Sequence, residues 1–174
     1  MKLVLALLIT VSFAAAQPNS SSSLTAPGCG PATARFEVKT TDQPPSPQME
    51  PGKALVYFVQ DDSTFDTRPR PTTRFAVDGN WMGATHSNSY LYISLDPGEH
   101  HLCASWQGSY ESWGSGYYAG ALHFTAEAGK TYYFSARNFA GRYNTPSVDF
   151  RPLDSDEFQL ILPRLELSVS RPKP

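Results

Sequence analysis

The sequence predicts an all-β fold: a single β-sandwich of the immunoglobulin/transthyretin-like type, built from about seven to nine antiparallel strands. Aromatic residues make up 13% of the chain and charged residues only 17%, a composition that favours sheets over helices. Twelve glycines and fifteen prolines divide the chain into short segments. Many of these segments alternate apolar and polar side chains, which is the pattern of strands with one buried face.

The first sixteen residues have the features of a secretory signal peptide. Lys2 precedes an apolar run from Leu3 to Phe13, and Ala14 to Ala16 supply the small side chains that a signal peptidase recognises. The run is too short to span a bilayer. We therefore expect export to the periplasm or the extracellular space, with no transmembrane segment after cleavage.

After the signal, the sequence predicts a leader, one domain and a short tail. Residues 17–32 are rich in Ser, Pro and Gly without hydrophobic periodicity, and we expect a disordered leader there. Residues 33–170 are long enough for one domain with its own core, and residues 171–174 form the tail. The formal net charge is −2 and no basic patch occurs, which argues against a nucleic-acid partner.

The first half of the domain contains a central strand and the start of a hairpin. Residues 35–39 alternate as a first strand, whereas residues 53–60 are apolar on both faces, as expected for a strand packed on two sides. Residues 61–72 are charged and contain prolines, which predicts a loop. Residues 73–77 then lead into Asp78-Gly79, a dipeptide typical of a tight hairpin turn.

The second half continues as short strands separated by turns. Residues 90–95 alternate, the turn Asp96-Pro97-Gly98 reverses the chain, and residues 99–106 return. Further strands are expected at residues 121–126, at residues 131–137 and around Val148 and Phe150.

The C-terminal region predicts one short helix and a last strand. Asp154 and Glu157 have the spacing of a capping box, which places the helix near residues 155–162. The apolar alternation within residues 158–162 fits a strand nearly as well. Residues 165–170 alternate cleanly as a strand. A third functional alternative is that a partner adds a strand to an exposed sheet edge, for which residues 165–170 are the candidate, and the opposing interpretation is that the flanking prolines protect that edge.

Four segments of the domain occur in a familiar order. They are Gly52 to Phe58 (GKALVYF), Val77-Asp78-Gly79, Tyr92 to His100 (YISLDPGEH) and Ala128 to Phe134 (AGKTYYF). Together they resemble the bacterial envelope family called domain of unknown function 2846, over about residues 52–165. The turns are also similar to those of PEGA-type surface modules. The resemblance implies a small extracytoplasmic β-sandwich, and it supplies no activity, cofactor or catalytic residue.

The segment DPGEHHLCASW, which begins at residue 96, concentrates residues that bind metals. On a strand, Glu99, His101 and Cys103 lie on one face. This set spans about 14 Å at the rise of a strand, so its two ends cannot both ligate one ion. A further ligand would have to come from His86 or His123. We therefore interpret the segment as a structural strand, and we expect no metal and no cofactor.

Cys29 and Cys103 are the two cysteines of the chain. In an oxidising compartment they predict a single disulfide, which would tie the N-terminal region to the domain. The alternative is two separate thiols, with Cys103 buried.

Residues 106–120 (WQGSYESWGSGYYAG) have the composition of a contact surface. Aromatic rings among Gly and Ser, with a single charged residue, are suited to binding sugars, peptides or another protein. The alternative is that these rings fold back over one end of the sandwich. The candidate ligand-contact residues are Trp106, Tyr110, Trp113, Tyr117 and Tyr118.

The sequence contains no constellation that identifies an enzyme. Carboxylates recur in the loops at residues 61–66 and 154–157, and two carboxylates at a fixed separation cleave glycosides in many hydrolases. A secreted hydrolase is therefore one alternative, although loop carboxylates are usually solvated or cap a helix. We expect a non-catalytic binding or structural accessory module of the cell envelope, whose partner is an unknown envelope protein or a glycan. A second alternative is a carbohydrate- or peptide-binding protein that uses residues 106–120.

Overall fold

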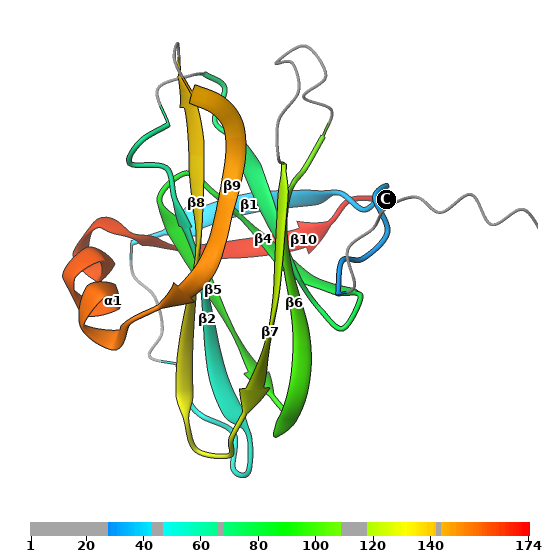
Figure 1. Cartoon of the computed structure of the whole chain (residues 1–174), viewed down its shortest axis with the longest axis vertical. Helices are drawn as coiled ribbons and strands as arrows, with labels where there is room; N and C mark the ends of the chain where they lie inside the picture. Colours follow the sequence, from blue (N-terminus) through cyan, green and yellow to red (C-terminus); the bar gives the residue numbers. More distant parts are fainter. Residues whose placement is uncertain (1–27, 43–46, 66–67, 109–117, 142–143) are drawn as a thin grey trace, which may run out of the picture.

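The computed structural model describes residues 28–42, 47–65, 68–108, 118–141 and 144–174. Within these ranges the chain forms ten strands, one short α-helix and one 3-10 turn (Figure 1). The helix α1 covers Ser155–Ile161, and the 3-10 turn η2 follows at Leu162–Arg164. The strands are β1 (Phe36–Thr41), β2 (Ala54–Asp61), β3 (Thr72–Val77), β4 (Asn80–His86), β5 (Ser89–Leu95), β6 (Gly98–Trp106), β7 (Ala119–Ala126), β8 (Thr131–Gly141), β9 (Asn144–Leu153) and β10 (Glu166–Pro172).

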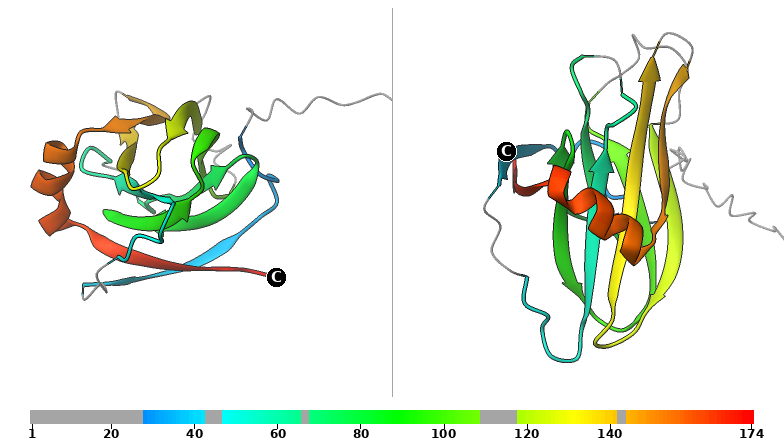
Figure 2. Two further views of the ribbon diagram at one scale, coloured as in Figure 1. Left: turned by 90° about the horizontal axis from the view of Figure 1, so that it is seen from below. Right: turned by 90° about the vertical axis from the view of Figure 1, so that its left-hand side faces the viewer.

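The strands form two sheets that pack face to face (Figures 1 and 2). The larger sheet has the order β1-β10-β5-β2-β8-β9, and the smaller has the order β4-β3-β6-β7. The predicted all-β class is confirmed. The number and direction of the strands differ from the prediction, because ten strands are described and two pairings, β2 with β8 and β10 with β5, are parallel.

The strand β4 was not predicted from the sequence, and the hairpin that it forms with β3 explains why. Asp78 and Gly79 both adopt positive φ, at 49° and 79°, as a tight hairpin turn requires. The register shifts between Phe75 and Ala76, so that Met82 has no partner of its own in β3. A bulge of this kind breaks the alternation of side chains that marks a strand in the sequence.

The central strand β2 is buried on both faces, as predicted for residues 53–60. Val56 and Phe58 face the smaller sheet, and the ring of Phe58 stacks on Phe75 of β3 with 5.0 Å between centroids. Val59 faces the opposite way, into a second apolar cluster on the outer side of the larger sheet. Burial on both faces explains why this segment lacks polar alternation.

The helix α1 covers that second cluster. Phe158, the buried residue of the helix, lies with its ring centroid 5.0 Å from that of Tyr57 and 4.4 Å from that of Tyr133. The prediction of one short helix near residues 155–162 is therefore confirmed, and the strand alternative is wrong.

The N-terminus of α1 is capped by Asp154, whose Oδ1 accepts a hydrogen bond from the backbone N–H of Asp156 at 2.8 Å. The predicted capping box is not closed by Glu157. Its carboxylate instead forms an ion pair with Arg151 of β9, at 2.8 Å. The helix is thereby tied to the strand that precedes it.

Residues 28–35, here called the N-terminal arm, lie across the outer face of the smaller sheet. The predicted disulfide is present: Cys29 is bonded to Cys103 of β6, with 5.0 Å between the Cα atoms. The indole N–H of Trp81 donates to the carbonyl of Pro31, and the Arg74 guanidinium donates to two further arm carbonyls while lying over the Trp81 ring. Residues 28–32, expected in the leader, thus belong to this arm.

The C-terminal strand β10 is an inner strand of the larger sheet. It pairs with β1 along six residues on one side and with β5 at Glu166 and Leu167 on the other. The expectation of an exposed edge at residues 165–170 is therefore wrong, because β1 covers that side. Figure 2 shows β1 and β10 lying together as a ribbon along one side of the molecule. The strand continues to Pro172, inside the segment expected as a tail.

Candidate functional site

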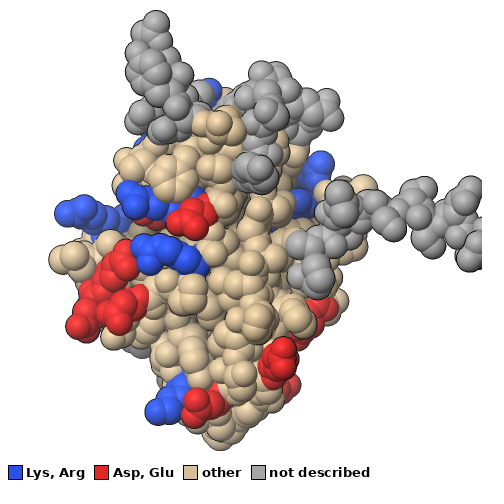
Figure 3. All heavy atoms as spheres, in the orientation of Figure 1, with Lys and Arg blue, Asp and Glu red and all other residues tan. Residues whose placement is uncertain are grey.

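A groove opens between the end of β7 and the start of β8, and we call it the β7–β8 groove. Its volume is about 300 Å³, at the lower end of the range of small-molecule sites, which is about 300–1,000 Å³. Among the residues that the structure describes, neither Lys nor Arg lines it. Figure 3 views the face that carries β7, β8 and β9, where charged side chains gather on the left-hand half, at the right-hand edge and near the lower end, and the rest of the visible described surface is largely uncharged. The lining of the β7–β8 groove includes Phe124, Thr125, Thr131, Tyr132, Leu153 and Asp154.

The groove exists because β7 and β9 approach each other at one end and separate at the other (Figure 1). Near the start of β7, a Cβ atom added to Gly120 would lie 2.7 Å from Cβ of Phe150, so the two strands are in close contact there. The last pair between β8 and β9 joins Tyr133 to Leu153. The chain then turns into α1, which leaves the first two residues of β8 without a partner in β9.

Aromatic rings of the inner layer form the floor of the groove. The Phe124 ring meets Tyr132 and Phe134 edge to face, with centroid distances of 5.0 and 4.8 Å. Phe124 and Tyr132 are half-buried, so parts of both rings face solvent, whereas Phe134 is buried. The Tyr132 hydroxyl accepts a hydrogen bond from the backbone N–H of Glu127 at 3.1 Å, which fixes the orientation of this ring.

A row of tyrosines lies on the opposite face of the larger sheet. Tyr57 of β2 is directly opposite Tyr92 of β5 and Tyr133 of β8, with ring centroids 5.8 and 5.3 Å away. Burial, together with the neighbouring tyrosines, raises the pKa of Tyr57 to about 12. Its hydroxyl therefore stays protonated at physiological pH. Tyr133 belongs both to this row and to the wall of the groove.

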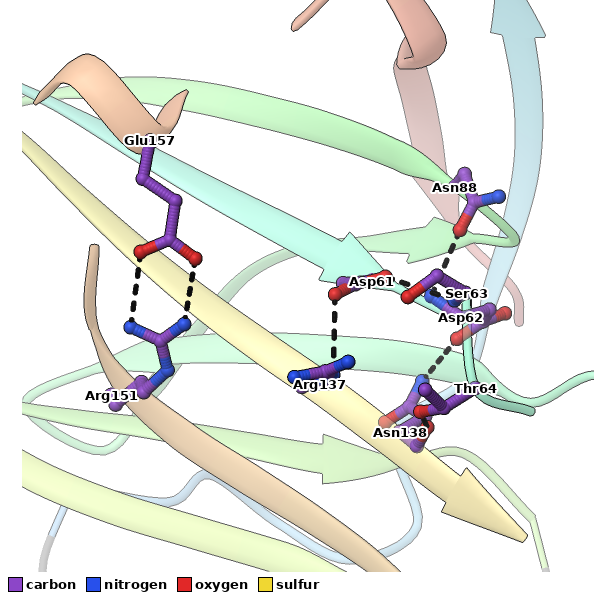
Figure 4. A network of polar contacts seen from close by, with 9 residues as sticks. All are labelled: Asp61, Asp62, Ser63, Thr64, Asn88, Arg137, Asn138, Arg151 and Glu157. Atoms are coloured by element: carbon purple, nitrogen blue, oxygen red, sulfur yellow. Dashed lines mark hydrogen bonds and ion pairs between the residues drawn. The ribbon is translucent and has the colours of Figure 1, made fainter. Parts of the chain in front are cut away.

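The described carboxylates of the two acidic loops border different pockets, Asp61 one and Asp154 another. Figure 4 shows the ion pairs of Asp61 and Glu157 with two different arginines. Asp61 pairs with Arg137, at 3.5 Å, and borders a small pocket near η2. Glu157 pairs with Arg151, and Asp154 caps the helix and borders the β7–β8 groove. Of the described carboxylates in these two loops, Asp61 and Glu157 thus pair with different arginines, and Asp154 caps the helix.

Asp62 lies in a buried polar cluster that the sequence did not reveal. Gln60 Nε2 donates to both of its carboxylate oxygens, at 3.0 and 2.9 Å, and Asn138 Nδ2 donates to Oδ1 at 2.7 Å. Burial raises the pKa of Asp62, although these two amides act in the opposite direction. The only signal of this cluster in the sequence was the pair of polar residues Gln60 and Asp62, two positions apart at the end of an apolar strand. The cluster is an internal connection between the sheets, because Asn138 also donates to Thr73 of β3.

The predicted aromatic contact residues are divided between the interior and the part of the chain outside the described ranges. Trp106 is only 2% exposed, and its indole N–H donates to Asn138 Oδ1 at 2.8 Å, so it belongs to the core rather than to a contact surface. The Tyr118 ring is half-buried, 5.1 Å from that of Trp106. Tyr110, Trp113 and Tyr117 lie outside the described residues.

The metal-binding residue types of β6 are separated by the fold. Cys103 is in the disulfide, and His100 bridges two turns through Asp78 and the carbonyl of Asp96. His101 is exposed on the outer face of the smaller sheet. Among the described residues, no group of three or more His, Cys, Asp or Glu side chains is placed to hold one ion.

Comparison with known families now adds to this geometry. Residues 50–147 match the family model described as a protein of unknown function, DUF2846. The chain belongs to the DUF2846 family. The resemblance inferred from the four sequence segments is thus confirmed, over a range that runs from just before β2 to the first part of β9. No curated protein and no solved structure matches the chain.

The DUF2846 match contains most of the β7–β8 groove, including Phe124 and Tyr132, but not the residues near α1 that close its far side. No helix in the described ranges is long and apolar enough to cross a membrane.

Proposed function

We propose that this DUF2846 protein is an exported, non-catalytic β-sandwich module that binds an uncharged glycan in the β7–β8 groove. The observation that carries the proposal is the half-buried aromatic floor of Phe124 and Tyr132 in a groove whose described lining contains no basic residue. Aromatic faces pack against the apolar face of a sugar ring, and hydroxyl and carboxylate groups at the rim accept or donate hydrogen bonds.

The rim supplies those polar groups. Thr125, Thr131 and Ser155 carry hydroxyls, and Asp154 carries a carboxylate. One oxygen of Asp154 already accepts from the helix, and the second oxygen is the rim's acceptor for a sugar hydroxyl. The absence of Lys and Arg from the lining disfavours sulfated or uronic-acid chains, because an anion would find no counter-charge there.

Export is supported by two features of the chain. The apolar run that ends in Ala14 to Ala16 matches a signal peptide, and the Cys29–Cys103 disulfide is stable in an oxidising compartment. The immunoglobulin/transthyretin-like classification of the sandwich is part of the same proposal. It is supported by two facing sheets in which most neighbouring strands are antiparallel. Cleavage before Gln17, measured by N-terminal sequencing of protein recovered from outside the cytoplasm, tests the export.

Binding is tested with the mature protein on an array of neutral and acidic glycans. We expect retention on neutral glycans only. Tyr132→Ala removes half of the exposed floor and should abolish retention, whereas Tyr92→Ala, on the opposite face of the sheet, should not change it. Thr125→Arg places a bulky charge at the exposed rim and should also abolish retention without altering the core.

Circular dichroism and thermal unfolding of each variant separate a local effect from loss of the fold. If no neutral glycan is retained by the wild-type protein, or if Tyr132→Ala and Thr125→Arg bind as well as the wild type, the proposal is wrong. Hydrolysis of a retained glycan over time would contradict the non-catalytic part alone.

A further inference from the structure

We propose that His101 and His123 form a binding site for a divalent transition-metal ion on the outer face of the smaller sheet. Imidazole nitrogen is a good ligand for Zn²⁺, Cu²⁺ and Ni²⁺. The site is independent of the β7–β8 groove. It differs from the set that the sequence suggested and that we rejected, which joined His101 to Glu99 and Cys103 along one strand.

The register of the sheet brings the two histidines together. His101 of β6 lies directly opposite His123 of β7. The backbone groups of His101 point away from β7, since its carbonyl accepts from Asp78 N and its N–H donates to Asp78 Oδ1, both at 2.8 Å. His101 and His123 are therefore a non-hydrogen-bonded pair, the kind in which facing Cα atoms are about 4.5 Å apart and side chains are closest.

The imidazole rings are at a distance that one metal ion can bridge. Their centroids are 6.2 Å apart. With Zn–N bonds of about 2.1 Å and ring nitrogens about 1.2 Å from the ring centre, two imidazoles on one ion have centroids about 5.4 Å apart in tetrahedral geometry and at most about 6.6 Å apart. The observed separation lies between these values, so small side-chain rotations are sufficient.

Both histidines are accessible, and the backbone of His101 is held by neighbouring residues. Each side chain is exposed, so an ion reaches them without unfolding. His101 is fixed by the two hydrogen bonds to Asp78 and by Gly28 of the N-terminal arm, where an added Cβ would lie 3.0 Å from its backbone and Cβ. The disulfide at Cys103 holds the same arm in place.

The surroundings favour a cation. Glu99 is exposed on the same face of β6, two residues before His101, and contributes negative charge. The two imidazoles are the only protein ligands that we assign among the described residues. The remaining coordination positions are therefore filled by water, or by a donor from a second molecule.

Titration calorimetry with Zn²⁺ tests the site, using mature protein without an affinity tag, freed of metal and kept non-reduced so that no thiol binds the ion. We expect one equivalent to bind. His101→Ala and His123→Ala should each weaken binding by more than about tenfold, which corresponds to about 1.4 kcal/mol. His86→Ala is the matched control: it removes an exposed histidine of the same sheet and should bind Zn²⁺ as the wild type does.

A second measurement does not depend on the variants. In the wild-type protein, imidazole NMR signals of His101 and His123 should shift together on addition of Zn²⁺, while those of His86 should not. Absence of saturable binding, wild-type affinity in either single variant, or loss of binding in His86→Ala would overturn the proposal. If an alanine variant fails to fold, the Zn²⁺ titration is repeated with His123→Gln in its place.

Discussion

Oδ2 of Asp78 lies 2.7 Å from Nδ1 of His100, and the carbonyl oxygen of Asp96 lies 2.9 Å from Nε2 of the same ring. Both partners are acceptors, so both contacts are hydrogen bonds when both ring nitrogens are protonated and the imidazole is a cation. Burial lowers the pKa of His100, but the bonds to Asp78 and Asp96 outweigh it, and the pKa is raised. One imidazolium thus joins the turn after β3 to the turn before β6.

This arrangement predicts how stability depends on pH. Because the folded-state pKa of His100 is raised above its ordinary value of 6.5, its contribution is complete below about pH 6.5 and is lost as pH rises through the folded pKa. Burial raises the pKa of Asp78, but the hydrogen bonds from the N–H of His101 and from the His100 ring outweigh burial, and the pKa is lowered. The contribution of Asp78 to stability is therefore present above pH 3.8 and is lost only in stronger acid.

The free energy of unfolding, measured by urea denaturation in chelator-containing buffer from pH 5 to 9, should therefore decline above neutrality. His100→Gln should flatten this decline, and His86→Ala should leave it unchanged. An identical pH profile for His100→Gln and the wild type would contradict the assignment of the imidazolium.

The disulfide is expected to stabilise the fold by about 4 kcal/mol, because it closes a loop over a sequence separation of 74 residues. The variant with Cys29→Ser and Cys103→Ser should lose this amount in urea denaturation. It should also release the N-terminal arm, which changes the fluorescence of Trp81 because the Pro31 carbonyl no longer accepts from its indole. Equal stability and equal Trp81 fluorescence in the two proteins would count against an arm held by this bond.

Trp106 is predicted to contribute to stability and not to ligand binding. Trp106→Phe keeps an aromatic ring in the core but leaves Oδ1 of Asn138 without its indole donor, which should cost about 1–3 kcal/mol in the free energy of unfolding. Trp81→Phe removes a hydrogen bond that is exposed to solvent, and it should cost less. A Trp106→Phe variant with wild-type stability would place this residue outside the polar cluster.

Gly120→Ala tests the contact that closes one end of the groove. The new methyl group would lie 2.7 Å from Cβ of Phe150, so β7 and β9 must separate, at a cost of about 1–3 kcal/mol. Ala121→Ser, at the next and exposed position, should be neutral. The measurement is the midpoint of thermal unfolding. A neutral Gly120→Ala would show that the strands are free to separate.

Local features of the fold were predictable because each is encoded by a few adjacent residues. Asp78-Gly79 makes its turn through positive φ, and the apolar segment around Phe58 is buried on both faces. Asp154 caps the helix as expected. In each case the side chains that specify the structure lie within one element.

The candidate site depends instead on which strands become neighbours. Alternation identifies Tyr132 as a strand residue, but it does not indicate that β8 pairs in parallel with β2 or that β9 stops opposite Tyr133. In the same way, the sequence did not place His123 opposite His101. Those relationships are set by tertiary packing of segments far apart in the chain, for which the pattern of one segment carries no information.

The first strand of the larger sheet, β1, reaches that sheet only through the last strand, β10. During synthesis, residues 36–41 emerge early and then have no strand partner until residues 166–172 follow. Completion of the native architecture is therefore a late event in biogenesis. A chain that stops before residue 166 leaves strand edges on β1 and β5 without their native partner, and such edges favour pairing with other chains.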